Sequence, residues 1–141
     1  MNGVSDDQNI RKLVREYRDL EVYKMAFTTS LSIHKSSLEF PKIEQYALAD
    51  QMRRASKSIC ANIAEGFAKQ QSSKAEFGRF LMMSLGSAQE MMVWIEYAHA
   101  LGYITNDQAE SWSGSYRSIT RMLQSLYSKS RGVRSSAHPV I

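Results

Sequence analysis

The sequence has few of the residues that interrupt helices or carry covalent and metal chemistry. Among its 141 residues there are one cysteine, two prolines and three histidines. A single cysteine excludes a disulfide within the chain and is typical of a reducing compartment, so we expect a cytoplasmic protein. Pro41 and Pro139 both fall outside the periodic segments, which leaves room for long uninterrupted helices.

Long apolar runs and targeting signals are also lacking. No segment approaches the roughly 20 consecutive apolar residues of a membrane span. The first residues, Met-Asn-Gly-Val-Ser-Asp-Asp, lack the basic and apolar regions of a secretory signal. We therefore expect no membrane partner. Since 43% of the residues are hydrophobic, the chain is apolar enough to fold, and its length fits one domain.

Four segments have the apolar spacing of amphipathic helices. The first is predicted to run from Asp19, a good N-cap residue, to about Leu38. Phe40-Pro41 then interrupts the pattern, because the residue before a proline is disfavoured in a helix. The apolar stripe of this first helix, predicted to face the core, consists of Leu20, Tyr23, Phe27, Leu31, His34 and Leu38.

The second helix, predicted from about Ile43 to Glu65, has three different surfaces. Its core-facing arc consists of Leu48, Met52, Ala55, Ile59 and Ile63. The opposite side is basic in its first part, with Arg53, Arg54 and Lys57. Further along it carries only small side chains, those of Ser58, Ala61 and Ala64. Such small side chains would let another helix approach closely. Gly66 is predicted to end the helix, since glycine readily adopts the left-handed conformation of a C-terminal cap.

The third helix is predicted to begin at a capping box, Ser73 with Glu76, and to end at Gly102. It is apolar on two sides. A helix of this kind is normally buried on both sides, and a single four-helix bundle cannot cover the second one. The sequence therefore predicts a homo-oligomer. The residues predicted at its interface are Met82, Met83, Gly86, Val93, Trp94 and Tyr97, together with Ser58, Ala61 and Ala64 of the second helix.

A second capping box, Thr105 with Gln108, begins a fourth helix that is predicted to reach about Lys129. Four helices of similar length with short connections predict an all-α protein, an antiparallel up-down-up-down four-helix bundle over residues 17–130. Residues 1–16 are expected to form an N-terminal arm, and residues 131–141 a flexible basic tail.

Positive charge is concentrated toward the end of the chain. The net charge is +4, and the stretch from Trp112 to Ile141 contains basic residues but no acidic one. Such a stretch is either a solvated surface or an anion-binding patch, and the sequence favours neither. If the protein binds phosphates, the candidate residues are Arg53, Arg54, Lys57, Arg117, Arg121, Arg131 and Arg134.

Motifs for catalysis and metal binding are weak. Glu96 and His99 have the Glu-x-x-His spacing of di-iron bundles, but such a site needs two copies of the motif and two further glutamates. Cys60 lies on the shoulder of the core arc of its helix, where a buried, inert thiol is expected. We therefore expect no enzymatic activity, no catalytic residue, no metal and no cofactor.

Several separated motifs resemble one known family. In chain order they are Tyr17-Arg18-Asp19-Leu20-Glu21-Val22-Tyr23, Phe40-Pro41 with Glu44 and Tyr46, the stretch Gln51 to Phe67, Glu76-Phe77-Gly78-Arg79-Phe80-Leu81, Gly86-Ser87-Ala88-Gln89-Glu90 and Leu101-Gly102-Tyr103-Ile104. Together they are similar to the bacterial four-helix bundle proteins known as 23S ribosomal RNA intervening-sequence proteins. These proteins are related to the accessory proteins of diversity-generating retroelements.

The resemblance implies a ring-like homopentamer with a basic surface that binds RNA or DNA and a reverse transcriptase. Combined with the charge distribution, it leads to the hypothesis of a non-enzymatic, homo-oligomeric module that binds nucleic acid, most plausibly RNA. The alternative hypothesis is a protein–protein interaction scaffold whose basic surface is incidental.

Overall fold

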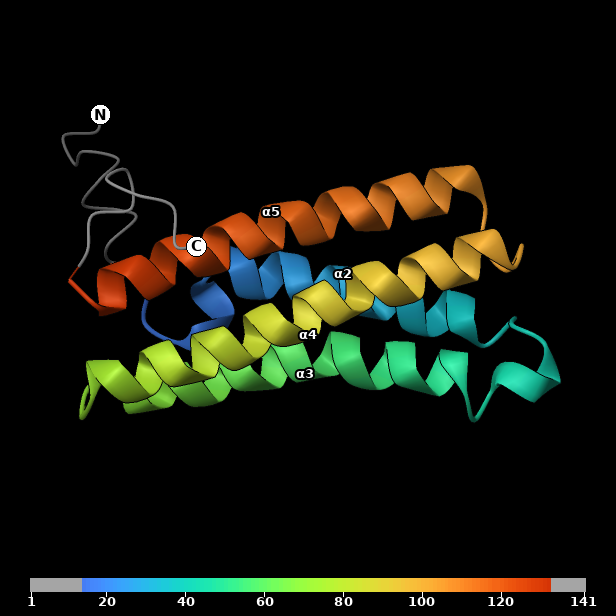
Figure 1. Cartoon of the computed structure of the whole chain (residues 1–141). Coiled ribbons are helices and arrows are strands. Elements are labelled where there is room, and N and C mark those ends of the chain that lie inside the picture. The colour runs from blue at the N-terminus through green and yellow to red at the C-terminus, as the bar shows by residue number, and fades with distance from the viewer. Residues whose placement is uncertain (1–13, 133–141) are drawn as a thin grey trace, which may run out of the picture.

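The computed structural model describes residues 14–132, which form four long helices and no strand. The long helices are α2 (Glu21–Ser37), α3 (Leu48–Lys69), α4 (Lys74–Ala100) and α5 (Asn106–Ser130), and they lie alongside one another (Figure 1). Short 3-10 helices, η1 (Tyr17–Asp19) and η2 (Lys42–Glu44), precede α2 and α3. The predicted all-α fold of four packed helices is confirmed. Within the described residues, no helix is long and apolar enough to cross a membrane.

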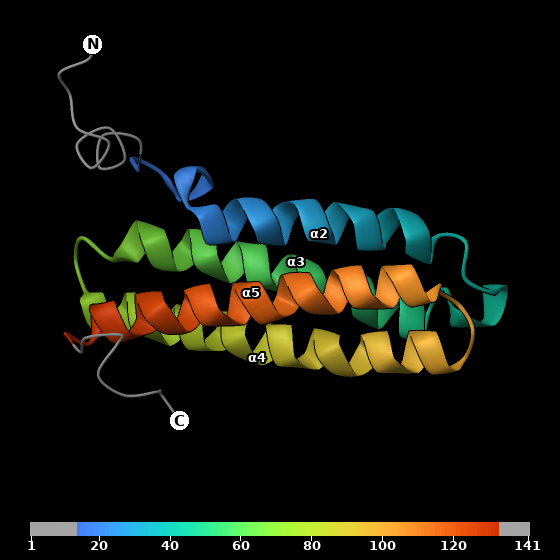
Figure 2. The same cartoon turned by 90° about the horizontal axis from the view of Figure 1, so that it is seen from above.

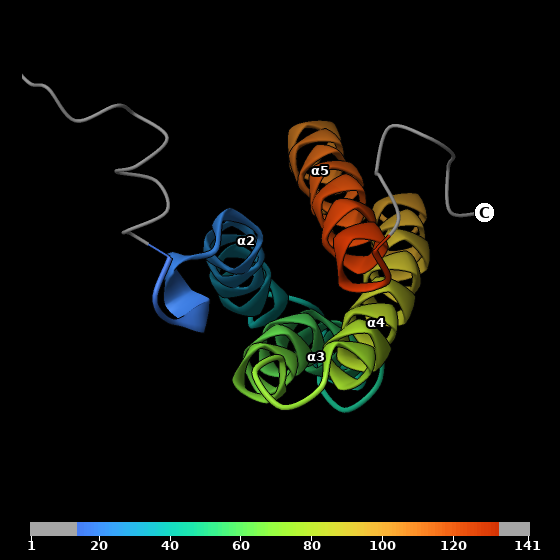
Figure 3. The same ribbon diagram turned by 90° about the vertical axis from the view of Figure 1, so that its left-hand side faces the viewer.

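The four helices enclose one core. Each helix packs against its neighbours in the chain, and α2 also contacts α5. Figure 2 shows the four axes running side by side along most of their length. Viewed along these axes, α3 lies between α2 and α4, and α5 lies diagonally across from α3 (Figure 3). A residue on the outer side of α3 is therefore remote from one on the outer side of α5.

The predicted apolar arcs of the last three helices form this core. On α3, Met52, Ile59 and Ile63 are fully buried, as expected from their spacing. The apolar arcs of α4 and α5 are buried in the same core. The side chains that α4 and α5 contribute are Phe77, Phe80, Leu81, Leu85, Ala88, Met91, Ile95 and Ala98 from α4, and Trp112, Tyr116, Ile119 and Leu123 from α5.

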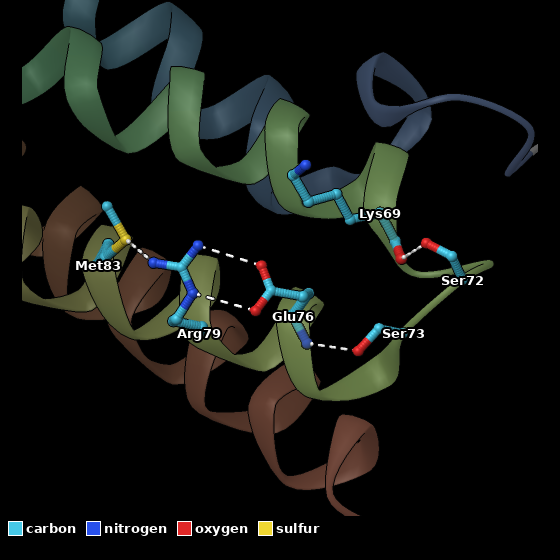
Figure 4. Close-up of polar contacts among 6 residues, drawn as sticks. All are labelled: Lys69, Ser72, Ser73, Glu76, Arg79 and Met83. Carbon is cyan, nitrogen blue, oxygen red and sulfur yellow. Dashed lines mark hydrogen bonds and ion pairs between the residues drawn. The ribbon is translucent and has the colours of Figure 1, made fainter.

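The caps that begin α4 and α5 follow the sequence signals. Ser73 Oγ accepts a hydrogen bond of 3.1 Å from the backbone N–H of Glu76 (Figure 4). The Glu76 carboxylate pairs with Arg79 at 3.1 Å, so only half of the predicted capping box forms. The box of α5 is complete, since Thr105 and Gln108 each accept from the backbone N–H of the other.

The predicted core stripe of the first helix is wrong for most of its length. Leu20 and Tyr23 pack against the core. The side chains of Phe27 and Leu31 on α2, and of Leu38 just after it, are 46%, 46% and 57% exposed. The face that α2 buries lies further round the helix and consists of Val22, Ala26, Thr29, Ser30, Ile33 and Ser37. A hydrogen bond of 2.8 Å between the buried hydroxyls of Ser30 on α2 and Ser56 on α3 stabilises α2 in this orientation about its axis. Small and hydroxyl side chains thus replace the large apolar stripe at this contact.

Three predicted helix boundaries are also wrong. The Asp19 carboxylate accepts from the backbone N–H groups of Arg15 and Glu16, so it caps the turn before η1 and α2 begins after Leu20. The helix predicted from Ile43 begins at Leu48, because Ala47 has a non-helical backbone. Gly66 does not end α3, which continues to Lys69. It is buried against α4, where an added Cβ would lie 2.7 Å from Phe80 Cβ.

Replacing Gly66 by alanine is expected to destabilise the protein. The added methyl would overlap Phe80 Cβ, which is bonded directly to the α4 backbone and cannot move aside, and overpacking of this kind costs about 1–3 kcal/mol. This exceeds the gain of about 1 kcal/mol that alanine brings to a helix interior. Urea unfolding should therefore show a lower free energy of unfolding for Gly66→Ala.

Gly114→Ala on α5 is the matched control. The nearest atom to an added Cβ there is the flexible end of Arg117, at 3.8 Å. The free energy of unfolding should rise by up to about 1 kcal/mol. Equal effects of the two substitutions would contradict the close contact of α3 with α4 at Gly66.

Candidate functional site

The basic residues of α3 have different surroundings. Arg53 is half-buried and donates hydrogen bonds to Ser37 Oγ at 2.8 Å, Gln45 Oε1 at 3.3 Å and the Gln45 carbonyl oxygen at 2.7 Å. These bonds join α3 to the end of α2 and to the segment between the two helices. The guanidinium of Arg53 therefore supports the fold, and its donors are largely used within the protein.

Arg54 and Lys57 lie on the outside of α3. Arg54 forms an ion pair of 2.9 Å with Asp50, one turn earlier in the same helix. Lys57 Nζ lies 3.0 Å from His34 Nδ1 on α2, and no carboxylate of the described residues pairs with it. Burial and the neighbouring Lys57 lower the pKa of His34 below its ordinary value, which keeps the imidazole neutral at neutral pH.

The basic residues of α5 are exposed and lack carboxylate partners. Within residues 14–132, the side chains of Arg117 and Lys129 form no hydrogen bond or ion pair, and the side chain of Arg121 bonds only to Ser118 Oγ, at 3.2 Å. Arg117 and Arg121 are one helical turn apart, about 6 Å along the axis, and so face the same way. Their charges are therefore available to an external anion.

Arg131, just after α5, contacts an aromatic ring. Its Nη1 donates to the Tyr127 hydroxyl at 2.9 Å, and its guanidinium carbon lies 5.6 Å from the centre of that ring. Arg134 lies outside the described residues. Because α3 and α5 are diagonal in the bundle (Figure 3), the six described candidates are divided between two surfaces. Arg117, Arg121 and Arg131 belong to one surface, and Arg53, Arg54 and Lys57 to the other.

An apolar groove of about 540 Å³ lies between α2 and α3. Its lining comes from the misassigned stripe of α2 and the small-residue face of α3, and consists of Tyr17, Tyr23, Phe27, Ser30, Leu31, His34, Lys57, Cys60, Ala61 and Ala64. The alanines of α3 make it hollow, and the large side chains of α2 form one wall. We call this feature the α2–α3 groove.

The outer face of α4 is a second exposed apolar surface. Its side chains Met82, Met83, Val93 and Tyr97 are 46%, 44%, 44% and 55% exposed. Trp94 is half-buried and donates to Glu90 Oε2 at 3.0 Å. An added Cβ on Gly86 would meet nothing within 4 Å, so this face is open at its centre. We call it the α4 ridge.

Ser58 is different from the other predicted interface residues. It accepts a hydrogen bond of 3.1 Å from Ser87 Oγ of α4 and bonds with the Asn62 side chain, so its hydroxyl joins α3 to α4 within the same chain. Ala61 and Ala64, in contrast, line the α2–α3 groove.

The residues considered for catalysis or metal binding are apart from one another. Cys60 is buried, and burial raises the pKa of its thiol to about 11, so it is protonated at neutral pH. His99 is exposed and its Nε2 contacts Asn106 Oδ1. Within residues 14–132 no group of three or more His, Cys, Asp and Glu side chains is placed to hold a metal ion.

Two features of the site were not predicted from the sequence, namely the α2–α3 groove and the structural role of Arg53. One signal for the groove was present, since Thr29, Ser30 and Ser37 form a hydroxyl-rich stripe beside the apolar stripe of α2. Hydroxyls at helical spacing allow close, hydrogen-bonded contact between helices. For Arg53 no local signal existed, because its partners are fixed by the path of the chain between α2 and α3.

Comparisons with known proteins agree with this fold. The sequence model of a family described as 23S rRNA-intervening sequence protein matches residues 18–125. A crystal structure from Bacteroides thetaiotaomicron, described as a protein of unknown function from the S23 ribosomal protein family, is similar at 27% sequence identity with a TM-score of 0.67. The similarity covers 75% of this chain and 94% of that one. No match was found among curated proteins.

Substitution of Arg53 by alanine is expected to lower stability. It removes three hydrogen bonds from a charged, half-buried donor and leaves the Gln45 carbonyl without this partner. We expect a loss of about 1–3 kcal/mol in the free energy of unfolding, measured in urea.

Arg54→Ala is the control, because the neighbouring exposed ion pair with Asp50 contributes about 0.5 kcal/mol or less. If Arg53→Ala lowered the free energy of unfolding as little as this control, Arg53 would not support the fold and would again be a candidate for phosphate binding.

Proposed function

We propose that this chain, which belongs to the 23S rRNA-intervening sequence protein family, is a non-enzymatic cytoplasmic protein that binds RNA through the basic face of α5. The observation that carries the proposal is the set of cations on α5 without carboxylate partners. The family match over residues 18–125 supports a connection with RNA through the name of the family. We call Arg117, Arg121 and Lys129 the α5 basic face.

Several exposed cations of the other helices, unlike those of this face, are paired with carboxylates. Arg54 is paired with Asp50, Arg79 with Glu76 and Lys24 with Glu21. From Trp112 onward α5 has no acidic residue that could form an ion pair with its cations. Phosphate oxygens of a nucleic acid backbone would supply the missing anions, and the release of counterions would drive binding.

The non-enzymatic part of the proposal rests on the state of the reactive groups. The raised pKa of Cys60 leaves little thiolate at neutral pH, and the pKa of His34 is lowered by desolvation and, after that, by the neighbouring Lys57. His99 contacts only Asn106, at the other side of the α4–α5 turn. None of these groups is paired with a second acid or base in a way that would activate it.

Assembly is a second part of the proposal. A homo-oligomer of up-down bundles, a pentamer according to the family resemblance, would repeat the α5 basic face by symmetry. Several weak contacts to one RNA then act together, and avidity can exceed single-site affinity by a factor of about 10²–10⁴. The exposed Met83, Val93 and Tyr97 support association, because monomeric proteins rarely leave a continuous apolar surface exposed.

A protein–protein interaction scaffold is the second candidate function. The exposed apolar surfaces of the α2–α3 groove and the α4 ridge favour it, and a reverse transcriptase is the protein partner that the family resemblance implies. In this case RNA affinity would be weak, and the charge of α5 would serve only solubility.

Charge reversal on α5 tests the RNA-binding proposal. For the double variant Arg117→Glu and Arg121→Glu, we expect the affinity for a structured RNA to fall about tenfold or more. The dependence of log K on log salt should become shallower by roughly 1–2, since each phosphate contact contributes about 0.7–0.9. Fluorescence anisotropy over a salt series measures both quantities.

Lys35→Glu with Lys42→Glu is the matched control. Both lysines are exposed, lie on or after α2, and give the same change in net charge. This variant should retain most of the affinity. If both double variants lose the same affinity, binding follows net charge and not the α5 basic face. If the unmodified protein shows no salt-dependent affinity, the scaffold becomes the better explanation.

A further inference from the structure

A pocket of about 410 Å³ lies between the first turns of α4 and the last turn of α5. Its walls contain one aromatic ring, one thioether and two guanidinium groups, and its lining includes Gly78, Arg79, Met82, Tyr127, Ser130 and Arg131. No carboxylate of the described residues is part of this lining. The volume is within the range of about 300–1,000 Å³ that is typical of small-ligand sites. We call this feature the α4–α5 pocket.

The ring of Tyr127 is held in position at this pocket. The last turn of α5 approaches α4 closely, since a Cβ added to the buried Gly78 would lie 3.5 Å from Tyr127 Cε1 and 2.9 Å from Ser130 Oγ. Arg131 Nη1 donates a hydrogen bond of 2.9 Å to the Tyr127 hydroxyl. The side chain of Tyr127 is only partly buried. It therefore offers a preorganised surface on which a flat group can stack.

The two arginines of the pocket differ in the donors that they leave available. Arg79 donates to both carboxylate oxygens of Glu76, at 3.1 and 3.3 Å, and contacts Met83 Sδ at 3.8 Å, as Figure 4 shows. Arg131 has no carboxylate partner among the described residues, and only its Nη1 forms a side-chain hydrogen bond. The Nε and Nη2 groups of Arg131 are therefore available to an anion that enters the pocket.

The α4–α5 pocket continues the basic surface of α5. Successive spacings of four, three and seven residues place positions 117, 121, 124 and 131 along one side of the helix. These positions are occupied by Arg117, Arg121, Gln124 and Arg131, with no acidic residue between them. The stripe is about 20 Å long, because a helix rises about 1.5 Å per residue. An RNA backbone that follows Arg117 and Arg121 toward the end of α5 thus reaches the pocket.

The chemistry of the pocket fits one nucleotide. Proteins bind unpaired bases by stacking them on aromatic rings and on the planes of arginine side chains, and they bind phosphates through guanidinium donors. Tyr127 supplies a ring, Met82 an apolar wall, and Arg131 free donors beside them. A base inside a duplex cannot enter such a pocket, because its two faces are covered by its neighbours in the stack.

We propose that the α4–α5 pocket binds one unpaired nucleotide of an RNA whose backbone lies on the α5 basic face. The base stacks on Tyr127, and Arg131 binds the phosphate. This inference rests on the proposed RNA binding and names the class of RNA, which is one with a single-stranded segment and not a blunt duplex. Every base has a face that can stack, so the protein selects an unpaired strand and not a sequence.

The affinities for three hairpin RNAs test the proposal. The first has a blunt end, and the second has a short single-stranded extension of adenosines. The third has an extension of the same length made of abasic riboses, which carries the same phosphates but no bases. We expect the second RNA to bind about 5- to 100-fold more tightly than the third, as stacking of one base contributes. Fluorescence anisotropy at fixed salt measures this ratio, and equal affinity for the second and third RNAs would overturn the proposal.

Substitutions at Tyr127 and Arg131 connect the preference with the pocket. Tyr127→Leu keeps an apolar side chain but removes the ring, so it should abolish the preference for the extension with bases. Tyr127→Phe is the matched control and should retain most of it. Arg131→Gln, at an exposed position, should weaken binding of the extended RNAs and leave the blunt hairpin nearly unchanged. These variants leave Met82 intact, because that residue also belongs to the α4 ridge.

A fluorescent adenine analogue in the extension provides a readout that does not depend on affinity. Its emission should be quenched when it stacks on Tyr127, and at saturating protein the quenching should be absent for Tyr127→Leu. Circular dichroism shows whether this variant is folded, since Tyr127 also packs against the core. If the folded Tyr127→Leu protein keeps both the quenching and the preference, the base binds elsewhere and the assignment of the pocket is wrong.

The same measurements separate this inference from the RNA-binding proposal. If the blunt and extended hairpins bind equally, with a salt dependence that Arg117→Glu and Arg121→Glu reduce, the protein binds RNA but the pocket takes no base. If no RNA binds, both proposals fail. Adenosine monophosphate should compete only weakly, because it lacks the contacts with the α5 basic face. Competition by this nucleotide as strong as that by the extended RNA would overturn the inference in favour of a site for a free nucleotide.

Discussion

Small side chains at the contacts with α3 are the constraint on which the rest of the structure depends. Ser56 meets Ser30 of α2 at 2.8 Å, and the Ile59 carbonyl accepts from Ser84 Oγ of α4 at 3.0 Å. Gly66 leaves room for Phe80 of α4. Each buried hydrogen bond adds only about 0.5–1.5 kcal/mol, but a buried hydroxyl without a partner costs about 1–3 kcal/mol. This difference penalises any rotation that would separate the hydroxyls.

This constraint also decides which surfaces the molecule presents. With α2 held by its hydroxyl stripe, Phe27 and Leu31 remain outside and form the α2–α3 groove. The outer face of α4 is apolar as well, while α5 presents Arg117 and Arg121. Apolar and basic surfaces are thus on different helices. A protein arranged in this way can associate with another protein through its apolar surfaces and bind an anion through its basic surface at the same time.

The arginines of this protein have different roles because their surroundings differ. Arg53 and Arg54 are adjacent in the sequence, yet Arg53 joins two helices through Ser37 and Gln45, and Arg54 forms a simple ion pair with Asp50. Arg117 has neither kind of partner. A count of positive charge cannot distinguish these cases, because the availability of a cation depends on the acceptors around it in space.

The sequence by itself determined the helices of α3, α4 and α5, their buried faces and the capping residues Ser73 and Thr105. These features depend on local spacing and on hydrogen bonds within a few residues. Only the tertiary structure decided the rotation of α2, the role of Gly66 and the partners of Arg53. In each case the deciding contact joins different helices, Ser30 with Ser56 and Gly66 with Phe80. An apolar stripe shows that a helix has a face to cover, but which neighbour covers it depends on side chains far away in the chain.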